Sequence, residues 1–236
     1  MNLFKNAIKK RNLNIDQYEN NIGYKINEKW FNNLVLYTQI TIKNNELNFN
    51  HGRILYSLLS NYINKNKDLT NLSIMETGTA RGFSSICMAR ALIDNKTNGT
   101  ILTLDCISHN EKIYWNVITD HSGKLTRKEL LEPWGEELSK IIFFQGWTIP
   151  TLNCIGQQRI NFAFLDAQHT KASVLKEFKY ISNLQKRGDI IFLDDVTRGL
   201  FDGVCQAVNE IEKLYPYKIE RLNFDKNRGY AIATKI

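Results

Sequence analysis

The chain has 236 residues, of which 43% are hydrophobic and 23% charged, a composition that excludes intrinsic disorder and suits one large α/β domain with an appendage. No run approaches the roughly 18 apolar residues of a membrane helix, and the basic start has no apolar stretch behind it, so neither a membrane span nor a secretory signal is expected. The net charge of +7 allows an anionic partner, but the basic residues are dispersed, which disfavours nucleic acid.

Residues 1–71 are the most polar part of the chain and contain 17 of its 27 asparagines. Within them, apolar residues recur at spacings of three and four, which predicts two helices. One runs through Trp30 to Tyr37 and the other through His51 to Ile63. We interpret this segment as an N-terminal helical cap or lid.

From Leu72 onward, short β-branched or aromatic runs alternate with helical patterns, which is typical of βαβ units. The expected parallel strands are Leu72–Met75, Thr100–Leu104, Ile141–Phe144, Ile160–Leu165 and Asp189–Leu193, and the expected helices are Phe83–Ile93, Lys171–Gln185 and Gly203–Leu214. The runs IIFF and FAFL are apolar throughout, as expected of strands buried on both faces. The pattern predicts an α/β fold with a Rossmann-like, doubly wound sheet.

The end of the chain departs from this alternation. Two strand-like runs, Tyr217–Asn223 and Gly229–Lys235, are separated by the polar turn Phe224–Arg228 and predict a hairpin. Residues 72–236 are therefore expected to form a seven-stranded, mostly parallel sheet closed by a C-terminal antiparallel hairpin. Residues 106–140 are an insertion too long for one crossover helix. Four of its side chains are expected to line an acceptor pocket or to pack within a lid: Tyr114, Trp115, Arg127 and Trp134.

An acidic, glycine-containing turn follows the first expected strand. In its sequence ETGTARG, the glycines let a ligand approach the main chain, and the next helix presents its positive N-terminus. The spacing Gly-x-x-x-Gly differs from that of dinucleotide binders, and Glu76 suits an ammonium or sulfonium group better than a pyrophosphate. A tight turn without a ligand is the alternative. The candidate contacts are Glu76, Gly78, Thr79, Arg81, Gly82 and Ser84.

Two further candidates end the second and third expected strands. Asp105 stands where an acid accepts the hydroxyls of a ribose in nucleotide-binding α/β folds, although aspartate also commonly ends strands. Gly146 and Trp147 follow the third strand, where the indole is placed either to stack on an adenine or to pack internally.

Three aspartates follow the fourth and fifth expected strands, and we call them the acid cluster: Asp166, Asp194 and Asp195. Neighbouring parallel strands end at one sheet edge, so these carboxylates are expected to converge. Uncompensated, they would repel one another, and a hard divalent cation such as Mg²⁺ with oxygen ligands explains them. His169 either faces the same cavity or makes only a local hydrogen bond, and Asp195 has a loop cap as its alternative role.

In this order the motifs resemble those of a class I S-adenosylmethionine-dependent methyltransferase. Glu76 to Gly82 resembles the first motif of that family, Asp105 its ribose acid and the hairpin its antiparallel last strand, over roughly residues 72–236. More narrowly, FLDAQH and FLDDV resemble the metal-dependent catechol-type and antibiotic-sugar O-methyltransferases. Aspartate at 195, where the catechol group has asparagine, favours the sugar-modifying group.

The resemblance implies site roles. The acid cluster would bind Mg²⁺, Asp166 would also contact the donor, and His169 would take the place of the catechol group's basic lysine. The donor methyl group is already activated, so positioning, a lowered hydroxyl pKa and proton removal by His169 would complete the catalysis.

The expected function is therefore S-adenosylmethionine-dependent, Mg²⁺-dependent O-methylation of a small sugar-like or natural-product metabolite. The alternatives are a metal-independent methyltransferase, an RNA-binding or RNA-modifying protein with the same fold, and a nicotinamide dehydrogenase, which Glu76 and the glycine spacing disfavour. Four scattered cysteines without a CxxC pair suit a reducing cytoplasm. The sequence leaves a homo-oligomer open.

Overall fold

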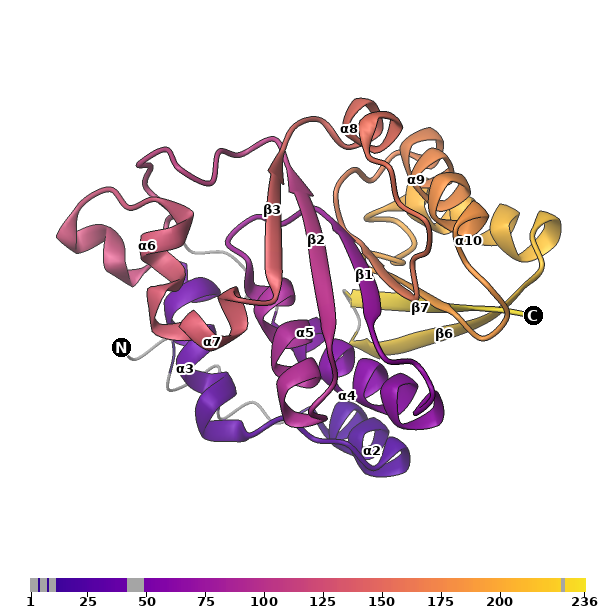
Figure 1. Ribbon diagram of the computed structural model, residues 1–236, viewed down its shortest axis with the longest axis horizontal. Helices are drawn as coiled ribbons and strands as arrows, with labels where there is room; N and C mark the ends of the chain where they lie inside the picture. The colour runs from indigo at the N-terminus through magenta and orange to yellow at the C-terminus, as the bar shows by residue number, and fades with distance from the viewer. Residues whose placement is uncertain (1–3, 5–7, 9–11, 42–48, 226–227) are drawn as a thin grey trace. The chain divides into compact units, whose positions relative to one another are not determined.

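The computed structural model describes residues 4, 8, 12–41, 49–225 and 228–236 (Figure 1). The chain divides into two compact units. The first contains residues 1–70, 80–98 and 108–141, and the second contains residues 71–79, 99–107 and 142–236. The domain limits 1–71 and 72–236 stay a prediction. No helix among the described residues has both the length and the apolar character needed to cross a membrane.

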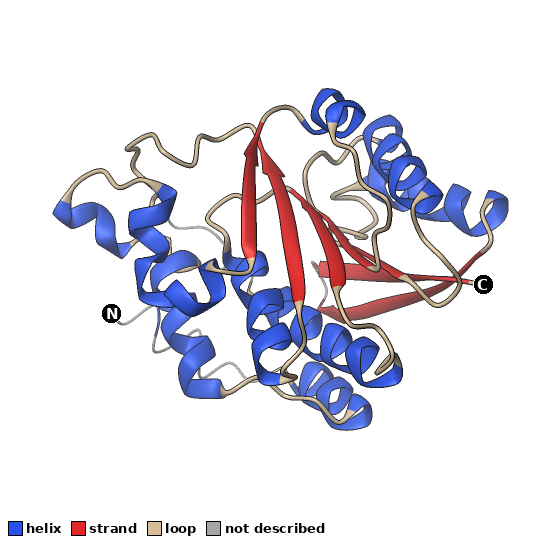
Figure 2. Ribbon diagram, viewed as in Figure 1, coloured by secondary structure: helices blue, strands red, loops and turns tan. Residues whose placement is uncertain are grey.

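The second unit is built on a seven-stranded sheet with the order β3-β2-β1-β4-β5-β7-β6 (Figure 2). Strands β1, β2, β4 and β5 pair in parallel, whereas β7 runs antiparallel to β5 and β6 antiparallel to β7. The predicted fold class is confirmed. The strands are β1 (Leu72–Thr77), β2 (Gly99–Asp105), β3 (Ile141–Gln145), β4 (Phe162–Leu165), β5 (Ile190–Leu193), β6 (Tyr217–Asp225) and β7 (Arg228–Lys235).

The central strands are buried on both faces, which is why their sequences are apolar without alternation. Every residue of β4 and β5 is buried. The same expectation was wrong for β3, where Ile142 and Phe144 are exposed because this strand lies at the edge of the sheet. Helices α8 (Thr148–Cys154), α9 (Lys171–Asn183) and α10 (Asp202–Leu214) pack on one face of the sheet. Their buried side chains share one core with that face, and they include Leu152, Val174, Phe178, Ile181, Val204, Ala207, Val208 and Ile211.

The hairpin turn is shorter than predicted. β6 continues to Asp225 and β7 begins at Arg228, so Phe224, Asp225 and Arg228 belong to strands rather than to a turn. The charged Asp225 is tolerated at the end of β6 because this strand lies at the edge of the sheet, and Arg228 stands opposite it in the register at the start of β7.

The first unit is helical (Figure 1). Its elements are α2 (Leu13–Ile22), α3 (Glu28–Thr38), α4 (Asn50–Lys65), α5 (Phe83–Asp94), η1 (Ile118–Ser122), α6 (Arg127–Leu131), η2 (Glu132–Trp134) and α7 (Gly135–Leu138). Both predicted N-terminal helices are present as α3 and α4. The sequence pattern missed α2, because this helix turns Asp16 and Glu19 inward, where both carboxylates pair with Arg53 of α4.

Candidate active site

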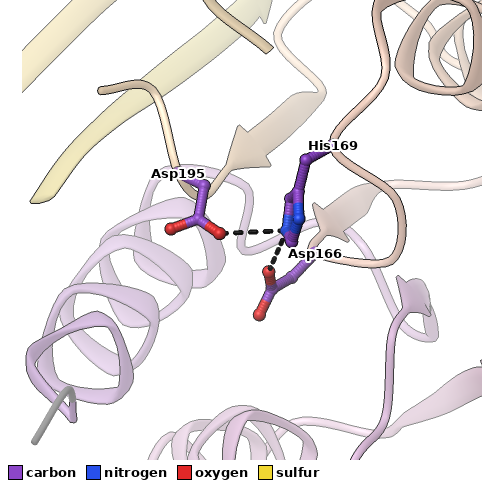
Figure 3. Close-up of side chains that lie close together, drawn as sticks. All are labelled: Asp166, His169 and Asp195. Carbon is purple, nitrogen blue, oxygen red and sulfur yellow. Dashed lines mark ion pairs between the residues drawn. The ribbon is translucent and has the colours of Figure 1, made fainter. Parts of the chain in front are cut away.

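Two of the predicted acids and His169 lie together at the end of the parallel strands (Figure 3). Asp166 follows β4 and Asp195 lies two residues beyond β5. The His169 Nε2 atom is 2.9 Å from Oδ2 of Asp195 and 3.7 Å from Oδ1 of Asp166. One ligand atom from each of the three residues lies within 4.8 Å of the others. The expected convergence at the sheet edge is therefore seen for Asp166 and Asp195.

Asp194, the third member of the acid cluster, has a different environment. Its side chain is buried, and its Oδ1 atom accepts the backbone N–H of Asp195 at 2.7 Å. Arg228 pairs with Oδ1 of Asp195, and its Nη1 atom is 3.7 Å from Oδ1 of Asp194. The acids were expected to be uncompensated, but two cationic side chains, His169 and Arg228, lie beside them. Arg228 is the main residue that sequence reasoning missed.

Burial and neighbouring charges shift the pKa values of the ionisable groups at the site. Hydrogen bonds to Asp166 and Asp195 raise the pKa of His169 to about 10, so the imidazole carries a proton at neutral pH in this arrangement. Burial raises the pKa of Asp166, and burial with the neighbouring acids raises that of Asp194 well above the usual range. The site thus holds acids that favour any nearby positive charge.

Asp195 also has an uncommon backbone conformation. Its φ is 59°, in the left-handed region, where few residues other than glycine, asparagine and aspartate are found. The Asp195 carbonyl accepts the N–H of Thr197 at 2.7 Å. This tight turn after β5 directs the carboxylate to His169 on one side and Arg228 on the other.

A buried carboxyl group on α9 lies behind the site. Oε2 of Glu177 accepts the hydroxyl of Thr77 at 2.7 Å, while its Oε1 atom is buried without a hydrogen-bond partner among the described residues. Glu177 lines a cavity of about 10 Å³ together with Asp166, His169 and Asp194. Burial raises the pKa of Glu177 to about 7. Sequence reasoning missed this residue, although it falls on the buried stripe of α9.

Glu177→Gln is expected to stabilise the protein above neutral pH. An acid whose pKa rises from 4.5 to about 7 on folding costs no stability below pH 4.5, and the full penalty applies above about pH 7, at most about 3 kcal/mol. Urea unfolding of both proteins from pH 4.5 to 8 should show a widening gap in favour of the variant. The exposed Glu220→Gln is the matched control, and a gap independent of pH would contradict the assignment.

On the donor side, part of the glycine turn lies in the second unit. A Cβ at Gly78, where φ is 92°, would collide with the carbonyl oxygen of Asp166, so this close approach requires glycine. Glu76 is fully buried within β1, one residue short of the strand end where it was expected. It accepts the Thr103 hydroxyl at 2.6 Å, and that hydroxyl is 2.6 Å from Oγ1 of Thr79.

The rest of this turn belongs to the first unit. The Arg81 Nε–H donates to the carbonyl of Trp115 at 2.7 Å. Gly82, with φ 83°, precedes α5, and Ser84 is buried in its first turn. Trp115 itself is buried, as are Arg127 and Trp134, so these three pack internally, whereas Tyr114 is exposed.

The predicted ends of β2 and β3 come together. The Gly146 N–H donates to the backbone carbonyl of Asp105 at 2.8 Å. The Asp105 carboxylate accepts the N–H of Ile107 at 2.8 Å and is partly exposed. Trp147 is 65% exposed, which favours a stacking surface over internal packing.

Comparisons with known proteins fit this architecture. Residues 75–196 match the family described as "Methyltransferase domain", just over half of the chain. No curated protein matched. The solved structures that share the fold include three methyltransferases. An O-methyltransferase from Bacillus cereus in complex with SAH has 17% identity and a TM-score of 0.59, and the match covers 82% of this chain and 84% of that one.

The second structure is the O-methyltransferase TomG from Streptomyces achromogenes, involved in tomaymycin synthesis and in complex with SAM. It has 19% identity and a TM-score of 0.56, with 78% of this chain and 79% of that one covered. An SAH-bound methyltransferase from Podospora anserina has 15% identity and a TM-score of 0.55, with 78% and 79% covered. At these identities the likeness establishes the fold. The chain therefore belongs to the methyltransferase domain family and has the class I fold of S-adenosylmethionine-dependent methyltransferases.

Proposed function

We propose that the protein is an S-adenosylmethionine-dependent O-methyltransferase that acts on a small hydroxylated metabolite, with a divalent cation such as Mg²⁺. The observation that carries this proposal is the convergence of Asp166, Asp195 and His169 at the carboxyl edge of a methyltransferase sheet. Similar structures bind SAM or SAH, which supports the same donor here.

The donor is proposed to rest on Glu76 to Gly82, with the ribose on Asp105 and the adenine beside Gly146 and Trp147. The exposed indole of Trp147 supports this placement. An acid that accepts two ribose hydroxyls makes charge-assisted hydrogen bonds, which are stronger than neutral ones.

Asp105→Ala is expected to weaken SAH binding by about 1–3 kcal/mol, because it removes these hydrogen bonds. Asp105→Asn is the companion variant, since its side-chain oxygen still accepts the Ile107 N–H and only the charge is lost. Calorimetric titration of both with SAH checks the claim. Affinities equal to that of the unaltered chain in both variants would remove Asp105 from the donor site.

The carboxylate oxygens of the acid cluster fit a hard divalent cation. Carboxylate oxygens are the ligands that Mg²⁺ and Mn²⁺ prefer, and we propose Asp166, Asp194 and Asp195 as the holding residues. A cation bound there would lower the pKa of an acceptor hydroxyl and take over the negative charge that holds the proton on His169. With that charge taken over, Nε2 of His169, which faces Asp166 and Asp195, would be free to accept the hydroxyl proton.

The acceptor is proposed to be a small molecule rather than nucleic acid, since the basic residues of the sequence are dispersed. The four cysteines, all among the described residues, form no disulfide, which suits the proposed reducing cytoplasm. The test is transfer of a radiolabelled methyl group from S-adenosylmethionine to a panel of sugar, catechol and natural-product hydroxyls, with Mg²⁺ or with chelator. Transfer that persists in chelator would favour the metal-independent alternative, and transfer to RNA alone would overturn the acceptor class.

A further inference from the structure

Arg228 is built into the acid cluster by the backbone around it. The Val196 N–H donates to the carbonyl of Gly229 at 2.8 Å, and the Gly229 N–H donates to Oγ1 of Thr197 at 2.8 Å. A Cβ at Gly229 would collide with the Val196 carbonyl oxygen. The turn after β5 and the start of β7 are therefore joined at a distance that only glycine permits, and the residue before this glycine is Arg228.

The side chain of Arg228 continues this attachment. Its guanidinium pairs with Asp195 and has its Nη1 atom 3.7 Å from Asp194. It also lies over the ring of Phe201, 5.9 Å from the ring centroid, and the ring centroid of His169 is 4.8 Å from that of Phe201. Because only 30% of its side chain is exposed, this arginine is held in the site rather than spread over the surface.

We propose that Arg228 is a resident counter-ion of the acid cluster, which competes with the divalent cation and sets the affinity of the site for it. This inference rests on the metal site proposed above. The guanidinium pairs with Oδ1 of Asp195 and, with His169 protonated, changes the formal charge of the site from −2 to −1. An arginine side chain stays protonated in proteins, so its positive charge weakens cation binding at every pH.

The position of Arg228 also predicts whether its removal strengthens or weakens cation binding. A divalent ion beside the acids would lie near the guanidinium, and like charges a few ångströms apart repel strongly at a partly buried site. Replacing Arg228 by a neutral residue is therefore expected to tighten cation binding by about tenfold or more. A lysine, which keeps a positive charge, is expected to leave the affinity close to that of the unaltered chain.

The test is titration of the full chain with Mn²⁺, following free Mn²⁺ by electron paramagnetic resonance. Arg228→Gln should bind Mn²⁺ about tenfold more tightly or better, whereas Arg228→Lys and the control Arg221→Gln should not. Arg221 is a matched control because it lies on the same hairpin but pairs with Glu212 of α10. The rise in melting temperature on adding Mn²⁺ is the second readout, which should be larger for Arg228→Gln even if that variant is less stable without metal.

Two other outcomes are decisive. Mn²⁺ binding that Asp195→Asn abolishes but Arg228→Gln leaves equal or weaker would overturn this inference and keep the proposed metal site. Absence of Mn²⁺ binding by both the unaltered chain and Arg228→Gln at millimolar concentration would overturn the inference and the metal site together. Retained SAH binding in that case would leave the methyltransferase assignment standing.

Discussion

His169→Ala is expected to lower the rate of methyl transfer by about 10²–10⁴-fold, the usual contribution of a positioned general base. The imidazole Nε2 is 3.7 Å from Asp166 and 2.9 Å from Asp195, and alanine leaves nothing there to accept the hydroxyl proton. With the cation bound and the negative charge of the acids no longer holding the proton, the unaltered enzyme should also lose activity as the pH falls and His169 becomes protonated. That acid limb should be absent from the rate profile of His169→Ala.

The comparison needs one control and one binding measurement. His121→Ala removes an exposed histidine of the first unit and should leave the rate unchanged. SAH affinity should be nearly the same in both variants, because the donor is proposed to rest on other residues. An unchanged rate in His169→Ala would exclude His169 as the general base and leave it only its ion pairs. A loss of SAH affinity would instead place His169 in the donor site.

Asp195→Asn is expected to abolish metal-stimulated turnover, with a loss of about 10²-fold or more, since a bound cation contributes several kcal/mol of charge stabilisation. The substitution suits the backbone, because asparagine adopts the left-handed conformation that Asp195 has at φ 59°. The lost activity therefore reflects the carboxylate charge rather than a strained turn.

The control for this change is Asp202→Asn at the start of α10. Its Oδ1 atom accepts the N–H of Gly199 at 2.8 Å outside the cluster, and asparagine retains that acceptor. Rates with Mg²⁺ and with chelator should be measured for both variants. Metal stimulation that survives in Asp195→Asn would exclude this carboxylate as a ligand.

The fold was predictable where burial dictates composition. Strands β4 and β5 consist of apolar residues because both of their faces are covered, and this made their ends, and hence the acids, easy to find. Helix α2 was not predicted, because its inward face includes Asp16 and Glu19, whose partner Arg53 is more than thirty residues away in the sequence. An apolar periodicity cannot reveal a face that is buried through ion pairs.

The sequence predicted the acids of the site but not the arginine that pairs with them. Arg228 stands 33 residues beyond its partner Asp195, and only the pairing of β7 with β5 brings the two together. The last pair of this register is Leu193 with Ala231, and two further residues along each strand would bring Asp195 opposite Gly229. Placing the hairpin beside β5 would therefore have located the arginine. Glu177 left a plainer signal, since it interrupts the stripe formed by Val174, Phe178 and Ile181.

The proposed donor site at this sheet edge must bind S-adenosylmethionine. The most direct measurement is calorimetric titration of the full chain with SAH and, separately, with NAD. We expect SAH to bind with micromolar affinity or better and NAD to give no heat beyond dilution. Tight binding of NAD with no binding of SAH would contradict the account.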